Sequence, residues 1–354
     1  MNESNDRIIQ EDIEDIVNNL SDNFSDLKNK TIFITGGTGL IGSQIVKTLV
    51  CFNRLKQMNM KILVWAMNEE EARRGLSDIM DREDIKIYYG DINDKIEIEE
   101  DIDYIIHGAS PTNSKFFVSN PVETINIIVN GTINVLEMAK TKNIKGMLFM
   151  SSLEVYGVPN KELVEENDYG YIDELNVRSS YSGGKRMAET ICASYASEYN
   201  IPVKIVRLSQ TFGPGVRYND GRVFAEFARC AIESKDIVLH TEGRTLRTYV
   251  YTKDAVSAIL FVLLKGEIGE AYNVANKETA MTIKEMAELV CKTFSASNIK
   301  VKIEIPEDVA KFGYNPEMII KLDSTKLEKL GWKPTVNMEN MFKNLVASME
   351  RDRM

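Results

Sequence analysis

Histidine and cysteine are scarce in this sequence, with two and four residues among 354. The four cysteines lie far apart and form no CxxC pair, so neither a disulfide framework nor a zinc site is predicted. The pattern instead predicts free thiols in a reducing compartment and no bound metal. The cysteines are Cys51, Cys192, Cys230 and Cys291.

Long apolar runs are also missing. The longest, residues 255–264, is interrupted by Ser257 and is too short to span a bilayer. The N-terminus, MNESNDRIIQEDIEDIV, contains acidic residues and no apolar stretch of the kind that directs secretion. We therefore expect a soluble, cytoplasmic protein that does not bind membranes.

Basic residues are outnumbered, with 43 Lys and Arg against 53 Asp and Glu and a formal net charge of -10. This negative charge argues against binding to nucleic acid, but it is compatible with a local basic pocket for a phosphate. The hydrophobic share of 44% and the charged share of 27% are typical of globular proteins. The length suffices for one large or two modest domains.

Apolar residues recur at helical spacing between residues 7 and 28, with acidic residues and asparagines between them. This pattern predicts one or two amphipathic helices in an N-terminal extension, residues 1–29. We expect the extension to pack on the main domain or on a second subunit.

Six apolar segments then alternate with helical patterns along the chain. Because these segments are apolar throughout, they predict the α/β class, with a parallel sheet covered by helices on both faces. The predicted strands are 31–35, 61–67, 85–92, 104–110, 146–152 and 202–210, and the main predicted helices are 44–51, 122–140 and 184–199.

A glycine-rich loop, TGGTGLIG at residues 35–42, connects the first predicted strand to the first predicted helix. Glycines permit a tight turn and let the backbone approach a pyrophosphate, while the helix N-terminus supplies free N–H groups. In this strand–loop–helix context the loop predicts a dinucleotide cofactor. Its predicted contacts are Gly36, Thr38, Gly39, Leu40, Ile41 and Gly42.

The second predicted strand ends at Met67 and is followed by Asn68 and Glu69, so the aspartate that usually binds the adenosine ribose is missing. NAD is the default prediction, with Asn68 as a contact. Arg73 and Arg74 further along keep NADP open.

The ends of the next two strands hold further candidate cofactor contacts. Asp91 and Ile92 follow the third strand and are candidates for contact with the adenine, although an aspartate in a strand-end turn explains Asp91 equally well. Ala109 follows the fourth strand, where small residues would let the cofactor lie close. His107 in the same segment is interpreted as structural.

Tyr181 and Lys185 stand four residues apart and therefore on one face of a predicted helix. A phenol has an ordinary pKa of about 10, and a neighbouring ammonium group stabilises its anion. The pair could then remove a hydroxyl proton while hydride leaves the same carbon. Ser152, at the end of the fifth strand, would hydrogen-bond the same substrate hydroxyl.

The chain resembles extended short-chain dehydrogenases/reductases of the NAD-dependent epimerase/dehydratase family, which act on nucleotide sugars. The likeness covers residues 30–345 and follows the family's order of motifs: TGGTGLIG, GDI, HGAS, SSLEVYG, YSGGK, TFGPG and RTYVYTKDAV. It implies a Rossmann-type doubly wound parallel sheet for residues 30–205, with the chain returning to it around 237–265. Residues 206–236 and 266–350 are expected to form a smaller mixed C-terminal lobe that holds a nucleotide diphosphate.

Within this family, NDGRV at 219–223 and RSSYSGGKR at 178–186 are similar to segments of UDP-glucuronate decarboxylases. The resemblance implies that Glu154 is an additional acid–base group and that Arg222 and Arg247 bind the diphosphate. A homodimer is usual for the family and is expected here. The other substrate contacts that the resemblance implies are Ser110, Arg178, Gln210 and Val223.

Two positions depart from the family pattern. Leu153 stands where dehydratases of the dTDP-glucose type have an acid, and Gln210 stands where the family often has an asparagine. We therefore favour transient oxidation at sugar C4 followed by decarboxylation to UDP-xylose. The alternatives are dehydration across C5–C6, C4 epimerisation, net reduction of a keto sugar with NADPH, and a non-catalytic NAD-binding protein.

Overall fold

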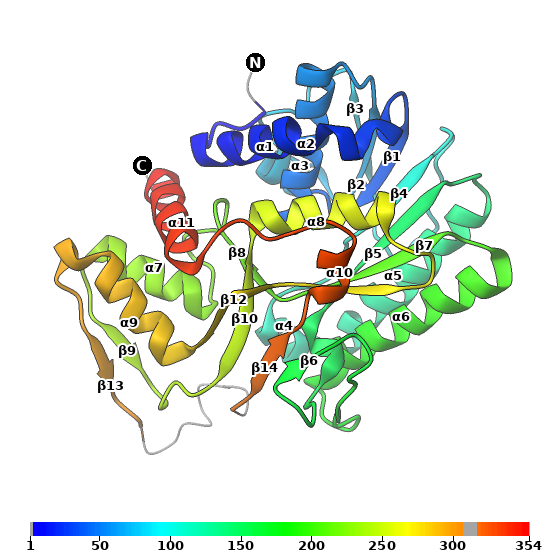
Figure 1. Cartoon of the computed structure of the whole chain (residues 1–354). Coiled ribbons are helices and arrows are strands. Elements are labelled where there is room, and N and C mark those ends of the chain that lie inside the picture. Colours follow the sequence, from blue (N-terminus) through cyan, green and yellow to red (C-terminus); the bar gives the residue numbers. More distant parts are fainter. Residues whose placement is uncertain (1–2, 307–316, 354) are drawn as a thin grey trace.

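A sheet of seven parallel strands forms the centre of the larger part of the molecule (Figure 1). The computed structural model describes residues 3–306 and 317–353. The strand order is β11-β7-β5-β4-β1-β2-β3, so the direction of winding reverses between β1 and β4. The strands are β1 Thr31–Thr35, β2 Lys61–Ala66, β3 Ile85–Tyr89, β4 Tyr104–His107, β5 Gly146–Ser152, β7 Val203–Leu208 and β11 Ala271–Val274.

All six predicted strands are present, and four of them end earlier than the sequence predicted. β3 ends at Tyr89 and β4 at His107, each directly before a glycine. These glycines lie against bulky side chains: a Cβ on Gly90 would be 2.6 Å from the Trp65 ring, and one on Gly108 would be 2.7 Å from the Met150 sulfur. The other two are β2, which ends at Ala66, and β7, which ends at Leu208 and is followed by the separate strand β8.

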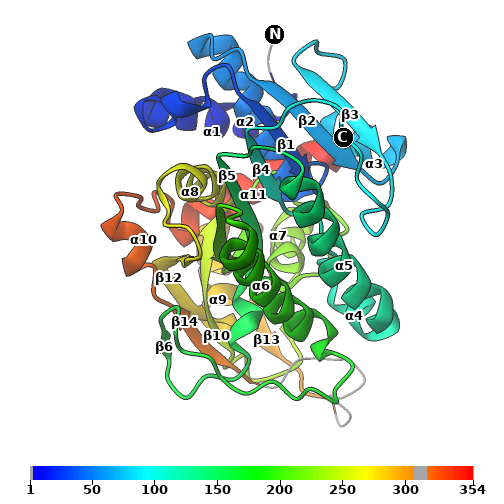
Figure 2. The same ribbon diagram turned by 90° about the vertical axis from the view of Figure 1, so that its right-hand side faces the viewer.

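Helices cover both faces of this sheet (Figure 2). Successive residues of a strand point to opposite faces, so Ile32 and Ile34 of β1 pack with one helical layer and Phe33 with the other. This arrangement explains why the strands are apolar throughout. One layer contains α1 Arg7–Leu20, α2 Leu40–Lys56, α3 Glu69–Leu76 and α8 Thr252–Lys265, and the other contains α4 Ser114–Ser119, α5 Pro121–Lys140 and α6 Ser179–Tyr199.

A smaller lobe is built on a mixed sheet, in the order β12-β10-β14-β6, with β8 beside β10. A separate two-stranded sheet joins β9 to β13. In the core of the smaller lobe Phe212 stacks on Phe224, with ring centroids 4.6 Å apart. The strands are β6 Leu163–Val164, β8 Gln210–Phe212, β9 Ile237–Leu239, β10 Leu246–Tyr251, β12 Asn276–Thr282, β13 Val301–Ile303 and β14 Ile319–Leu322, and the helices are α7 Val223–Glu233, α9 Ile283–Thr293 and α11 Met338–Arg353. The short helix α10 Thr325–Lys329 packs on the large sheet instead, because its Leu327 is buried in the same apolar cluster as α8.

The chain crosses between the two parts more than once. β9 and β10 belong to the smaller sheets, whereas the next helix, α8, packs in the core of the large sheet. The expected lobe at 266–350 includes residues 307–316, and the expected extension at 1–29 includes residues 1–2; both segments lie outside the described residues.

The N-terminal extension is helical, as predicted. It consists of α1 and a 3₁₀ helix, Ser21–Leu27. Ile13 and Val17 of α1 are buried in the same apolar cluster as α2 and α8, so the extension packs on its own chain. None of the helices in the described part of the chain combines the length and apolar character that a membrane span requires.

Candidate active site

The phosphate loop meets the segment after β4 at the point where the winding of the sheet reverses. Gly36 has a φ of +71°, and a Cβ there would be 2.6 Å from the carbonyl carbon of Gly108. A Cβ on Gly42 would be 2.0 Å from the Gly36 oxygen. Only glycine fits at these two positions. In open α/β sheets, ligands bind outside the carboxyl ends of the strands at such a reversal.

Gly39, by contrast, faces open space. A Cβ built there would have one close neighbour, the Gly36 oxygen at 3.5 Å. Gly39 is also the N-cap of α2 and makes no side-chain cap, so the first N–H groups of the helix are available to an anion. Leu40 and Ile41 turn their side chains into apolar clusters, which leaves their backbone for such a contact. This cradle fits a pyrophosphate.

The candidate contacts for the adenosine part of the cofactor, Asn68, Asp91 and Ile92, have local partners. The Asn68 side chain caps α3 by accepting a hydrogen bond from Glu71 N at 2.9 Å. Asp91 Oδ1 accepts from Asn93 N at 2.8 Å, which is the turn geometry that the sequence offered as the alternative. The Ile92 side chain is buried in the core, and its carbonyl accepts from Asn134.

His107 helps to fix the backbone beside the phosphate loop. Its Nδ1 lies 2.6 Å from the Thr35 hydroxyl, and that hydroxyl accepts a hydrogen bond from Ala109 N at 3.2 Å. Burial, with a smaller contribution from the Lys185 charge, lowers the pKa of His107 to about 3, so the ring is neutral near pH 7. Its contacts are those of a structural residue.

Ser152, Tyr181 and Lys185 come together at the carboxyl ends of the strands. Tyr181 and Lys185 lie on α6 beside β5, and Tyr181 shares a hydrogen bond with Ser152. The Lys185 ammonium donates to the Met150 carbonyl at 2.8 Å and lies 6.0 Å from the centre of the Tyr181 ring. Burial lowers the pKa of Lys185 to about 8, and the nearby Glu189 carboxylate opposes this effect.

In the protein without a bound cofactor, the Tyr181 phenol keeps its proton. Burial raises its pKa above the ordinary value, and the negative charge of Glu154 adds to this rise. The hydrogen bond with Ser152 and the positive charge of Arg178 oppose it. Tyr181 can act as a base only as the phenolate, and formation of the phenolate needs further positive charge beside the ring.

A second charged pair stands next to this group. Arg178 donates to Glu154 Oε1 at 3.0 Å, and both side chains are about one-fifth exposed. The Phe117 ring stacks on Tyr181 with centroids 4.3 Å apart, while the Arg178 guanidinium lies 4.9 Å from the same ring. The structure thus places Arg178 and Tyr181 against one aromatic side chain, with Glu154 paired to Arg178.

A buried polar network lies behind the catalytic candidates. Glu189 is one helical turn beyond Lys185 and accepts hydrogen bonds from Ser151 Oγ at 2.5 Å and Arg207 Nε at 3.0 Å. Arg207 is 2% exposed and also donates to the Tyr156 hydroxyl at 3.0 Å. The network connects the end of β5 to α6 and β7.

The candidate diphosphate ligands differ in their present contacts. Arg247 Nε on β10 is buried and has no hydrogen-bond partner among the described residues. Arg222, at the N-cap of α7, contacts Asp220 in its own loop, at 2.6 Å. A bound anion would give Arg247 Nε the hydrogen-bond acceptor that it lacks. At Arg222 the anion would compete with Asp220 for the guanidinium.

The remaining substrate candidates stand on separate elements. Gln210 begins β8 and pairs with Tyr249 of β10. Val223 is the first residue of α7, and the Ser110 hydroxyl donates to the Pro111 carbonyl at 3.3 Å. Leu153, the position of the missing acid, is 3% exposed and packs in an apolar cluster with β6 and β14.

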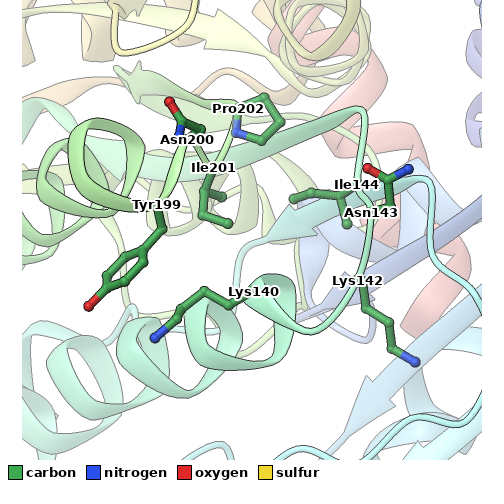
Figure 3. A pocket seen from close by; sticks show the side chains of 8 residues that line it. All are labelled: Lys140, Lys142, Asn143, Ile144, Tyr199, Asn200, Ile201 and Pro202. Atoms are coloured by element: carbon green, nitrogen blue, oxygen red, sulfur yellow. The ribbon is translucent and has the colours of Figure 1, made fainter.

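A cavity of about 270 Å³ lies away from this site, at the amino ends of β5 and β7 (Figure 3). Its two lysines already have partners. Lys140 pairs with Glu137 at 3.1 Å and lies over the Tyr199 ring, and Lys142 donates to the Ile98 carbonyl at 2.7 Å. This cavity is on the opposite edge of the sheet from the catalytic candidates.

Sequence reasoning missed Phe117, Ser151, Glu189 and Arg207. Phe117 carries no motif, and its contact with Tyr181 arises only when α4 packs on α6. Glu189 stands four residues after Lys185, so the helical spacing that identified Tyr181 and Lys185 could also have found it.

Residues 32–275 match the NAD dependent epimerase/dehydratase family. UDP-glucuronic acid decarboxylase 5 of Arabidopsis thaliana is 30% identical over 312 residues, which cover 88% of this chain and 86% of the relative.

Solved structures share the fold. A UDP-N-acetylglucosamine 4-epimerase from Methanobrevibacter ruminantium has a TM-score of 0.78 and 22% identity and covers 92% of this chain and 100% of its own. A dTDP-glucose 4,6-dehydratase from Streptomyces venezuelae, solved with NAD and TYD bound, has a TM-score of 0.74 and 20% identity and covers 91% and 98%. The family match spans most of the chain and includes the phosphate loop and the Tyr181–Lys185 helix, and the chain is therefore an enzyme of the NAD-dependent epimerase/dehydratase family.

Proposed function

We propose that this enzyme decarboxylates UDP-glucuronate to UDP-xylose by transient oxidation at sugar C4. The observation that carries the proposal is the Glu154–Arg178 pair beside Tyr181, because it adds a second acid–base group to the oxidation site. A simple C4 epimerase has little use for such a group. The decarboxylase relatives support the same choice.

Each catalytic candidate has a distinct part in this reaction. Ser152 hydrogen-bonds the C4 hydroxyl, and Tyr181 accepts its proton while the Lys185 ammonium stabilises the phenolate. NAD, which the backbone of the phosphate loop at Gly39 would hold, would supply the hydride acceptor and the positive charge beside the phenol. With a ketone at C4 and a carboxylate at C6 the sugar is a β-keto acid, so the C5–C6 bond breaks, CO₂ leaves and its electron pair stays on C5. Glu154 then assists protonation of C5. Return of the hydride to C4 and of the Tyr181 proton to its oxygen restores the C4 hydroxyl, so the cofactor ends in its starting oxidation state.

Dehydration across C5–C6 needs an acid that protonates the departing C6 hydroxyl. The position that would hold this acid in dTDP-glucose-type enzymes is Leu153, whose apolar side chain is buried in the core. This observation favours decarboxylation over dehydration.

We propose NAD rather than NADP as the cofactor. Three glutamates form the first turn of α3, directly after β2, and they pair with both nearby arginines. Arg74 contacts Glu70 at 2.6 Å and Glu71 at 2.7 Å, and Arg73 pairs with Glu69. These exposed pairs are individually weak. The three glutamates outnumber the two arginines, and this excess of negative charge repels a 2′-phosphate. Mass analysis of the nucleotide released on denaturation distinguishes the two cofactors.

The nucleotide diphosphate is assigned to the smaller lobe. Arg247 Nε, which is buried and has no partner in the part of the chain that the structure describes, supports a diphosphate contact, and Arg222 at the start of α7 supplies a second guanidinium. We further expect a homodimer, which light scattering would test.

The test of the proposed function is a mass spectrum of the nucleotide sugar after incubation with UDP-glucuronate and NAD. We expect a product that has lost CO₂, without net formation of NADH. An unchanged mass would exclude this substrate, and a neutral UDP- or dTDP-hexose that loses water or inverts at C4 would identify one of the alternative reactions.

A further inference from the structure

The N-terminal strap, residues 3–17, connects the two parts of the molecule. Figure 1 shows α1 of the strap beside α2, with the C-terminal helix α11 nearby. On the side of the large sheet, the strap is anchored to Arg54 of α2. The Glu3 side chain is fully buried and accepts from Arg54 Nε at 2.6 Å, and Glu14 accepts from Arg54 at 2.8 Å.

On the side of the smaller lobe, the strap reaches the turn at residues 213–215. Ser348 of α11 donates its hydroxyl proton to Asp6 Oδ2 at 2.5 Å and accepts a hydrogen bond from Gly215 N at 3.0 Å. Ile9 lies against the same glycine: its Cδ1 is 3.3 Å from the position of a Cβ on Gly215. Asp6, Ser348 and Gly215 thus form a hydrogen-bonded relay.

The turn at residues 213–215 lies between α2, the helix of the cofactor cradle, and the loop that ends at Arg222. Gly215 has a φ of +84° and leads into residues 216–222, which end at Arg222 and the start of α7. On the other side of the turn, Gln44 of α2 donates to the Pro214 carbonyl at 2.8 Å. Because α2 begins at the phosphate loop, one turn is held both by the helix of the cofactor cradle and by the strap.

We propose that the N-terminal strap is a positioning element for the nucleotide half of the substrate. Through the Asp6–Ser348–Gly215 relay, the strap holds residues 213–223 in the conformation in which Arg222 can bind a diphosphate. The inference rests on the proposed function, which assigns this loop to the nucleotide. The cofactor cradle does not depend on the relay, because the phosphate loop is held by its own glycine contacts.

The test measures binding of UDP to the NAD-loaded enzyme by calorimetry in Asp6→Asn, Ser348→Ala and the double variant. A buried hydrogen bond to a charged group sets the scale, and we expect UDP to bind about tenfold more weakly in each single variant. The double variant should be no weaker than the single ones, because both changes break one relay. The content of bound NAD should stay constant. Arg7→Ala is the matched control, since Arg7 directly follows Asp6 in the chain but its side chain is 89% exposed.

A second measurement needs no added UDP. Hydrogen–deuterium exchange in the NAD-loaded enzyme should be faster at the amides of residues 213–222 in Ser348→Ala, and unchanged in Arg7→Ala. Unchanged UDP affinity and unchanged exchange in both relay variants would show that the strap is only structural and would overturn the inference. A wild-type enzyme that binds neither UDP nor dTDP would overturn the proposed function, and the inference with it.

Discussion

Glu189 and Arg207 form a two-contact ion pair inside the protein, with Arg207 Nε 3.0 Å from Oε1 and its terminal nitrogen 2.7 Å from Oε2. Both side chains are less than one-tenth exposed. The pair joins α6 to β7 and holds Ser151, the neighbour of Ser152. It therefore supports the catalytic group from behind.

Arg207→Met should destabilise the protein strongly. The change leaves the Glu189 carboxylate buried without its cation, and such losses lower the free energy of unfolding by about 3–5 kcal/mol. Urea unfolding measures the effect. Arg7→Ala, which breaks only a surface pair, should change stability by less than about 1 kcal/mol. A similar small loss in Arg207→Met would contradict the assignment.

Glu189→Gln should shift the pH dependence of turnover. Burial lowers the pKa of Lys185 to about 8, and Glu189 opposes that lowering. The surrounding titratable groups do not replace the lost negative charge. Among the described residues they include Tyr181, Arg186 and Cys192 on α6, His107 on β4, Tyr156 after β5 and Arg207 on β7.

Without Glu189 the Lys185 ammonium loses its proton at lower pH, so the alkaline decline of kcat should begin at lower pH. Ser151→Ala is the control, because it removes one hydrogen bond to Glu189 and keeps the charge. An identical pH profile in Glu189→Gln would mean that Glu189 does not set the charge of Lys185.

Tyr181→Phe should abolish turnover while NAD stays bound. The phenyl ring keeps the stacking on Phe117, but no group accepts the C4 proton. Loss of a general base lowers kcat by about 10²–10⁴. Product analysis and cofactor release from one preparation measure both effects, and a variant of normal activity would disprove the catalytic assignment.

Two glycine substitutions in the phosphate loop should have opposite consequences. Gly39→Ala leaves the fold intact, because the new Cβ has ordinary contacts, but it should prevent retention of the dinucleotide. Gly42→Ala should instead lower thermal stability, because its Cβ would overlap the Gly36 oxygen. Thermal melting and measurement of bound nucleotide separate the two. Normal cofactor content in Gly39→Ala would argue against the pyrophosphate cradle.

Asp12→Asn should raise stability at alkaline pH. Asp12 lies on α1 with Oδ2 unpartnered among the described residues, and burial raises its pKa to about 7. Its pKa is higher in the folded state than in the unfolded state, so ionisation destabilises the fold as the pH rises from about 4 to about 7.

The asparagine variant removes this penalty, which amounts to at most about 4 kcal/mol for a shift of about three pKa units. Chemical unfolding should show a more stable variant at about pH 8 and equal stabilities at about pH 4. Equal stabilities at both pH values would refute the assignment.

Local sequence determined the elements and the part of the site that lies on one element. A strand buried on both faces is largely apolar, which was enough to predict β1 and β5. Tyr181 and Lys185 share a face of α6 because they are one helical turn apart. The phosphate loop could be predicted for the same reason, because its glycines are required by close contacts within a few residues or at the end of a neighbouring strand.

Only the tertiary structure decided which distant residues meet. Asp6 and Ser348 are 342 residues apart in the chain, and Phe117 reaches Tyr181 only through the packing of α4 on α6. Leu153 follows Ser152 directly, yet its side chain lies in the apolar cluster with β6 and β14 rather than in a polar site. Such contacts depend on which strands and helices become neighbours, and that choice minimises the free energy of the whole core rather than of any segment.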